Sequence, residues 1–251
     1  WSIRCSRRLH PRRSRSRAAS LARAALVGAV VAGGAAYVVA RQQRRVRERY
    51  RILTAPFPEE LLDVLSAPGG GGRLTFAGDD LLDSATGAAY PVVDGIPDFS
   101  LASAARAEKP AADEWGWLRE LYTPLGPLLL GSHPAGNMAL AGAVADAAVG
   151  GWALSVPCGL GEHEIEMARA NPHAHILCVH AQWNPLLETR RRALEAKIAN
   201  LYFARGSAIL LPLQDESVEA VWTANGFHLY TAPELAMTQI ARVTKPGGLV
   251  A

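Results

Sequence analysis

The sequence predicts a doubly wound α/β fold with a parallel sheet for residues 151–251. Short apolar runs suited to buried strands alternate there with segments whose apolar spacing suits helices. The first strand-to-helix junction, 158–161, reads CGLG and so places two glycines at a turn. The chain has 251 residues, 49% of them hydrophobic, which is enough for one large domain or two small ones.

The expected elements follow one another in a regular alternation. Four strands are expected, at 152–156, 175–179, 201–204 and 218–222. Three helices are expected, at 162–170, 185–200 and 233–243. Asn184 as N-cap and Pro185 in the first turn predict where the second helix begins. The sequence KPGG at 245–248 predicts the end of the third helix, with a further strand from Leu249.

Residues 1–51 form a basic segment that differs from the rest of the chain. They hold fourteen Arg and one acid, Glu48, whereas the remaining 200 residues hold 12 basic and 22 acidic side chains. The 17 residues 24–40 are uncharged and flanked by Arg, a length at the lower limit for a transmembrane helix. A chloroplast or mitochondrial targeting peptide, a membrane anchor and an Ala-rich surface helix all stay open. We expect membrane contact through 24–51 and no nucleic-acid binding by the acidic body.

Two smaller segments precede the α/β region. Residues 52–99 are expected to form a small β-rich module, because turn residues separate short alternating runs. Residues 100–150 are expected to be a helical linker or cap that Pro124 and Pro127 interrupt. The chain begins with Trp1 and stops at Ala251, soon after the KPGG turn, so we expect a fragment whose sheet is truncated at the C-terminal side.

The loop 158–161 is typical of a ligand site. Ligands of open α/β sheets bind beyond the carboxyl ends of the strands, where glycine lets the backbone approach them closely. The next residues, Glu162, His163 and Glu164, would repel a pyrophosphate, and Glu164 occupies the place of the third glycine of a dinucleotide fingerprint. The loop therefore suits a cofactor without phosphates, and a nicotinamide oxidoreductase is disfavoured.

Residues 151–251 resemble the class I S-adenosylmethionine-dependent methyltransferases of the type 11 kind. The resemblance is carried by ALSVPCGLGEHEIEMARANPHAHILCV, ANLYFARGSAILLPLQDESVEAVWTANGFHLY and PELAMTQIARVTKPGGLV. It implies a Rossmann-like fold, S-adenosylmethionine as cofactor, and methyl transfer to a small-molecule or RNA acceptor. The cofactor-binding residues that it implies are Ser155, Cys158, Gly159, Gly161, His180, Ala181, Ser207, Ala208, Asn225 and Tyr122. His228 is the candidate general base, or else a polar residue at a strand end.

Three acids of the family's cofactor site are replaced in this sequence. The family has acids for the cofactor's ammonium end, ribose hydroxyls and adenine amino group, where this chain has Ser155, His180 and Ser207. Each lost charged hydrogen bond costs roughly 1–3 kcal/mol. A catalytically inactive relative that acts as a membrane-tethered binding or scaffolding subunit for an unknown protein partner therefore stays open beside the enzyme. Cofactor binding discriminates between the two.

The sequence at 61–99 resembles the zinc-ribbon module that precedes some methyltransferases. The resemblance rests on APGGGGRL and DSATGAAYPVVDGIPDF. The family's four Cys positions are here Ala67, Gly70, Asp83 and Thr86, which implies a module without zinc that depends on its neighbours. An unrelated Gly-rich loop is the alternative. The three cysteines, Cys5, Cys158 and Cys178, form no CxxC pair and predict neither a disulfide nor a metal site.

Overall fold

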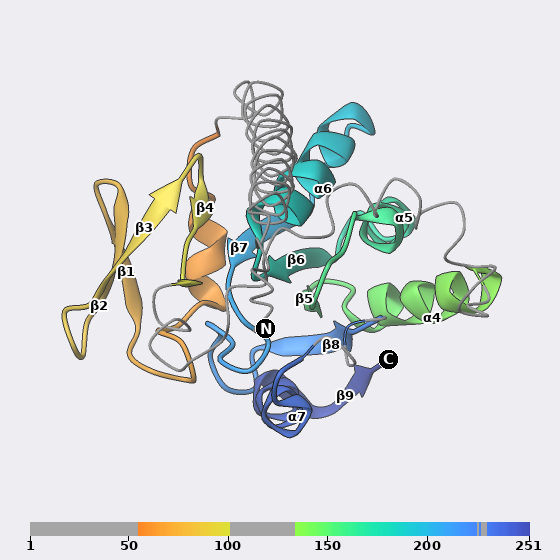
Figure 1. Cartoon of the computed structure of the whole chain (residues 1–251). Coiled ribbons are helices and arrows are strands. Elements are labelled where there is room, and N and C mark those ends of the chain that lie inside the picture. Colours follow the sequence, from red (N-terminus) through yellow and green to blue (C-terminus); the bar gives the residue numbers. More distant parts are fainter. Residues whose placement is uncertain (1–54, 101–133, 225, 227–229) are drawn as a thin grey trace, which may run out of the picture. The chain divides into compact units, whose positions relative to one another are not determined.

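The computed structural model describes residues 55–100, 134–224, 226 and 230–251 (Figure 1). By its contacts the chain divides into two units, Trp1–Arg51 and Ile52–Ala251, and every described residue belongs to the second. The expected hydrophobic helix at 24–40 lies outside the described residues. Three predicted site residues also lie outside them, namely Tyr122, Asn225 and His228.

Five parallel strands form the central sheet, in the order β7-β6-β5-β8-β9. The strands are β5 (Trp152–Ser155), β6 (His175–His180), β7 (Leu201–Arg205), β8 (Val218–Trp222) and β9 (Thr244–Val250). The chain proceeds from β5 through β6 to β7 and then crosses to the other side of β5 for β8 and β9. The strand order therefore reverses between β5 and β8, which is where doubly wound sheets bind ligands.

Helices cover both faces of this sheet (Figure 1). They are α4 (Pro134–Ala147), α5 (Glu162–Ala170), α6 (Trp183–Glu195) and α7 (Pro233–Val243). The first three pack on one face against Ala153 and Ile176, and α7 packs on the other face with Leu154 and Val221. Neighbouring residues of a strand point to opposite faces, and burial of both faces explains why these strands are continuously apolar. The expected α/β fold with a parallel sheet is confirmed.

The N-terminal part of the described chain is a small antiparallel sheet. After a short 3-10 helix, η1 (Glu59–Asp63), its strands follow in chain order as β1 (Leu74–Ala77), β2 (Asp80–Asp83), β3 (Ala89–Val93) and β4 (Ile96–Pro97). The β-rich character expected from the turn residues is therefore present. Four strands this short do not provide a core of their own.

The small sheet shares its hydrophobic core with the large one. Leu65 and Phe99 are buried in one cluster with Leu177 of β6 and Leu213. Backbone bridges join Leu65 to Leu213 and Asp98 to Arg205, at the β7 edge of the parallel sheet. The packing that the small module needs therefore comes from the α/β region.

Helix α6 differs from its expected bounds at both ends. It begins at Trp183 with Gln182 at the N-cap, so the prediction of Asn184 as N-cap is wrong. A proline fits in the first turn of a helix because the N–H groups there have no helical partner, so the helix can begin before Pro185. The helix ends at Glu195 rather than at 200, because Lys197 adopts a left-handed φ of 56°.

Strand β9 begins at Thr244, five residues before the expected start at Leu249. Thr244 pairs with Val218, but Leu249 pairs with Ala220, so the KPGG sequence forms an irregularity inside the strand. Gly247, with a φ of 78°, supplies the conformation that such a bulge requires. The expectation that KPGG separates helix from strand is therefore wrong. Within the described ranges, no helix is long and apolar enough to span a bilayer.

Candidate cofactor site

Strand β5 ends at Ser155, at the centre of the parallel sheet. Ser155 pairs with Cys178 of β6 on one side and with Trp222 of β8 on the other. The loop 156–161 leaves from this point and leads into α5. The Val156 N–H donates to the carbonyl of Trp222 at 2.9 Å, and the Cys158 N–H donates to that of Val179 at 3.3 Å. These hydrogen bonds hold the loop over the carboxyl ends of β8 and β6.

The two glycines of the loop are needed for different reasons. Both adopt positive φ, 53° for Gly159 and 80° for Gly161. A Cβ atom at Gly159 would meet no other atom within 4 Å, whereas one at Gly161 would lie 2.5 Å from Cγ2 of Thr189 in α6. Gly161 therefore lets α5 approach α6 closely, and Gly159 leaves open space beside the loop.

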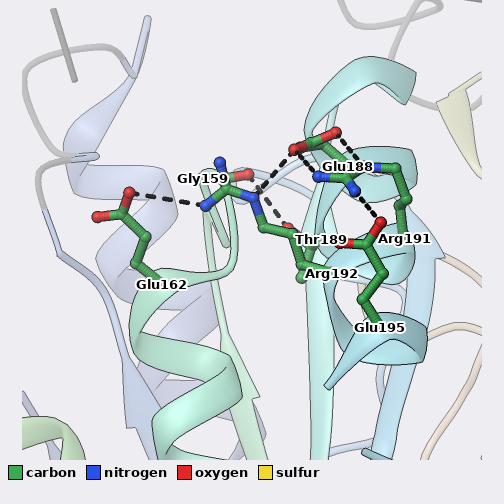
Figure 2. Close-up of polar contacts among 7 residues, drawn as sticks. All are labelled: Gly159, Glu162, Glu188, Thr189, Arg191, Arg192 and Glu195. Atoms are coloured by element: carbon green, nitrogen blue, oxygen red, sulfur yellow. Dashed lines mark hydrogen bonds and ion pairs between the residues drawn. The ribbon is translucent and has the colours of Figure 1, made fainter. Parts of the chain in front are cut away.

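Helix α6 fixes the loop and pairs the charge at the start of α5. The Thr189 hydroxyl donates to the carbonyl of Gly159 at 3.5 Å (Figure 2). The guanidinium of Arg192 lies 3.6 Å from the carboxylate of Glu162, the first residue of α5, and 3.0 Å from that of Glu188. The acidic helix start is therefore paired in part by a cation from the neighbouring helix. Arg191 also pairs with Glu188, at 2.7 Å (Figure 2).

A buried carboxyl group lies beneath the loop. Glu164 is only 2% exposed, and its Oε1 accepts a hydrogen bond of 2.5 Å from the hydroxyl of Ser155, which has no exposed surface. Burial raises the pKa of Glu164 to about 7, although the hydrogen bond from Ser155 lowers it. Sequence reasoning noted the acid missing at Ser155 but missed that α5 turns another acid toward the same point. The helical spacing of Glu164 with the buried Ala168 could have indicated it.

Two further groups lie near the end of β5. The ring of His163 contacts the ring of Trp222, with centroids 5.2 Å apart, and burial lowers the pKa of His163. Cys158 and Cys178 are both buried and form no disulfide. Burial and the neighbouring Cys158 raise the pKa of the Cys178 thiol, so it stays protonated. No cluster of three His, Cys, Asp or Glu suited to a metal was found among the described residues.

The ribose-side candidates follow β6. Nδ1 of His180 accepts a hydrogen bond of 3.0 Å from the N–H of Gln182, so the neutral ring carries its proton on Nε2. The carbonyl of Ala181 accepts a hydrogen bond of 3.0 Å from Nε of Arg205. Nε2 of His180 is therefore a hydrogen-bond donor. It cannot accept a hydrogen bond from a ribose hydroxyl as a carboxylate oxygen would.

The adenine-side candidates follow β7. Ser207 and Ala208 are buried, and the Ser207 hydroxyl accepts the N–H of Ile209 at 3.2 Å. The Gly206 N–H donates to the carbonyl of His180 at 3.2 Å, which joins this turn to the end of β6. The ends of β5, β6 and β7 thus bring the described candidates to one edge of the sheet.

A residue that sequence reasoning did not single out also contacts the loop. The Tyr230 hydroxyl donates to the carbonyl of Val156 at 3.1 Å. Gly226 packs closely on Pro157, because a Cβ atom there would lie 2.2 Å from its Cδ. Gly226 and Tyr230, which follow β8 in the chain, therefore both contact the beginning of the loop.

Comparison with known protein families gives one match, to the family described as "Methyltransferase domain", over residues 153–248. That range contains most of β5, the loop, β6 to β8 and most of β9. The match assigns this segment the Rossmann-like α/β fold of methyltransferase domains, in agreement with its parallel sheet.

Curated relatives match a part of the chain of similar length. A fatty-acid O-methyltransferase of Mycolicibacterium smegmatis is 34% identical over 95 residues, which cover 38% of this chain and 34% of that protein. A demethylmenaquinone methyltransferase of Halalkalibacterium halodurans is 30% identical over 101 residues, which cover 39% and 40%. The chain thus spans well under half the length of these two relatives.

Two solved structures are similar to part of this chain. The YcgJ protein of Bacillus subtilis is 22% identical with a TM-score of 0.42, covering 46% of this chain and 50% of that one. The [4+2]-cyclase SpnF is 29% identical with a TM-score of 0.41, covering 45% and 44%.

Proposed function

We propose that the methyltransferase domain binds S-adenosylmethionine at the loop 156–161 and transfers its methyl group to a small-molecule acceptor. The proposal rests on Gly159, which has a positive φ and open space where a side chain would be. It lies where the strand order reverses, within the segment that matches the family. Bound S-adenosylmethionine would supply an already activated methyl group on its sulfonium. The chain's own part is then binding, orientation and exclusion of water.

The residues present fit the methionine part of the cofactor best. The space beside Gly159 admits it, and the Ser155–Glu164 pair lies beneath the loop. At the ribose and adenine ends, His180 and Ser207 already accept hydrogen bonds from nearby backbone N–H groups. We therefore expect the methionine end to contribute more of the binding free energy than the ribose and adenine contacts do.

We infer a small apolar acceptor. The two curated relatives are named for a fatty acid and for demethylmenaquinone, both of which are lipophilic. The excess of acidic over basic side chains in residues 52–251 disfavours RNA. A targeting peptide or membrane anchor in residues 1–51 stays a prediction. The membrane or organelle location that would follow from it also stays a prediction.

We also infer that residues 55–99 are a zinc-ribbon-like module that folds without metal. Asp83 stands at one of the four Cys positions of the resemblance, and it accepts hydrogen bonds from the Ala85 N–H at 2.9 Å and the Thr86 hydroxyl at 2.5 Å. Gly72 of the other turn lies directly against the Asp83 carboxylate. A hydrogen-bonded carboxylate between two turns supports this interpretation.

A pair of matched glycine variants tests the cofactor site. Gly150 and Gly159 share positive φ and open space at Cβ, but Gly150 precedes β5 and Gly159 lies in the loop. Gly150→Ala and Gly159→Ala should each cost about 1–2 kcal/mol of stability from backbone strain. Only Gly159→Ala should also weaken S-adenosylmethionine binding, by about tenfold or more, measured by calorimetric titration. Equal affinities in the two variants would contradict a site at this loop.

A further inference from the structure

Glu164 is a buried acid that forms no ion pair with any residue of the described ranges. Its carboxyl group contacts the Ser155 hydroxyl, and no described Lys, Arg or His forms an ion pair with it. The other ionisable groups near it are Cys158 of the loop, Cys178 of β6 and Glu162 of its own helix. Burying an unpaired carboxylate is costly, so an acid retained in such a place calls for a reason.

The position of Glu164 indicates what could pair with it. Ser155 is the last residue of the central strand, beside the point where the strand order reverses. The loop above it opens at Gly159. A ligand cation held by that loop would favour the ionised form of Glu164, because an opposite charge nearby stabilises a carboxylate. The effect is reciprocal, so the ionised carboxylate would strengthen binding of the cation.

We propose that Glu164 is the acid of the cofactor site and provides from α5 the negative charge that Ser155 does not provide from β5. The inference rests on the proposed function, because S-adenosylmethionine supplies the cation, its ammonium group. Both Glu164 and Ser155 are buried, so Glu164 is a positioning residue. It acts on the ligand through the Ser155 hydroxyl and the loop and by its charge, without touching the ligand.

Binding should therefore release a proton below neutral pH. The negative charge of Glu162 favours the protonated form of Glu164. The ammonium group of the ligand acts in the opposite direction and lowers the pKa of Glu164. Affinity should then rise with pH until Glu164 is ionised in the free protein as well.

The test measures affinity against pH in the full-length chain. Wild type, Glu164→Gln and Glu166→Gln are titrated with S-adenosylhomocysteine by calorimetry at pH 5.5, 6.5 and 7.5. This probe keeps the ammonium group but lacks the sulfonium charge. Wild-type affinity should rise about tenfold or more over this range, and that of Glu164→Gln should stay flat and weak. Glu166 is an exposed acid of the same helix, so Glu166→Gln should match wild type.

An exchange variant guards against a purely structural effect of the substitution. Glu164→Ala should lose affinity at pH 7.5, and Ser155→Asp combined with Glu164→Ala should regain it, because the charge then comes from β5. 5′-Methylthioadenosine has no ammonium group and should bind independently of pH.

Each outcome separates the inference from the proposed function. A pH dependence that persists in Glu164→Gln, or an exchange variant no better than Glu164→Ala, overturns the inference and leaves the cofactor site standing. Failure of the wild type to bind S-adenosylhomocysteine at any pH overturns the proposed function and the inference together.

Discussion

The glycine at the start of α5 shows how a single residue sets the geometry of the site. Gly161 has a φ of 80° and faces Thr189 of α6, whose hydroxyl in turn holds the carbonyl of Gly159. A side chain at Gly161 would therefore push α6 away from the loop. The same contact brings Arg192 close to Glu162.

We predict that Gly161→Ala destabilises the fold by about 2–5 kcal/mol, through backbone strain and overpacking. Thr189→Ala should relieve part of this cost, because Cγ2 and Oγ1 of Thr189 are the atoms nearest to the added Cβ. Urea unfolding of the two single variants and the double variant measures their coupling. Additive effects would show that the two residues do not press on each other.

Glu164 also makes stability depend on pH. Its folded pKa of about 7 lies above the ordinary value of 4.5, so the protonated form is the one that the fold favours. The stability that this preference contributes is full below pH 4.5 and is lost as pH rises through 7. Between pH 5 and 8, the free energy of unfolding of the wild type should fall by on the order of 2–3 kcal/mol relative to that of Glu164→Gln. Parallel stability curves for the two proteins in urea unfolding would contradict a buried, protonated Glu164.

Among the elements, α6 joins the loop to the small β module. Thr189 contacts the loop, and the next residue, Arg190, is 7% exposed and donates to the carbonyl of Asp94 at 2.6 Å. Burial lowers the pKa of Arg190, and the Asp94 charge opposes that effect. One turn of helix thus connects the loop 156–161 to the small β module.

We predict that Arg190→Ala lowers the free energy of unfolding by about 2–3 kcal/mol, because the charged hydrogen bond of a buried guanidinium to the Asp94 carbonyl is lost. The neighbouring Arg191 forms its ion pairs with Glu188 and Glu195 of the same helix, so Arg191→Ala should cost less than about 1 kcal/mol. Urea unfolding of both variants measures the difference, and similar losses would argue against this connection.

The sequence predicts some elements better than others for local reasons. The bounds of α5 and α7 agree with the structure, because glycine, proline and polar residues mark their ends. The end of α6 and the start of β9 depend on pairing and packing far along the chain, which no local signal records. The Ser155–Glu164 contact likewise required knowing that α5 turns Glu164 toward β5.

At the scale of the whole second unit, the small β module and the parallel sheet share one core. Leu61, Leu65 and Phe99 are buried among residues of β5, β6 and β8. Gln214 further donates to the carbonyls of Leu62 and Leu65, at 3.3 and 3.1 Å. The two parts should therefore unfold together.

We predict that Phe99→Ala, at the centre of this shared core, costs about 3–5 kcal/mol and keeps a single unfolding transition. Far-ultraviolet circular dichroism and tryptophan fluorescence, followed in the same urea titration, should give coincident curves. Two separate transitions in the wild type would show that the small module folds on its own.

Binding of S-adenosylmethionine at the loop 156–161 is best tested by calorimetric titration of the cofactor into the wild-type chain at pH 7.5. We predict saturable binding with a Kd in the micromolar range, roughly −8 kcal/mol at 1 μM. No heat and no thermal shift at millimolar cofactor would contradict it and would favour a binding or scaffolding role for the fold.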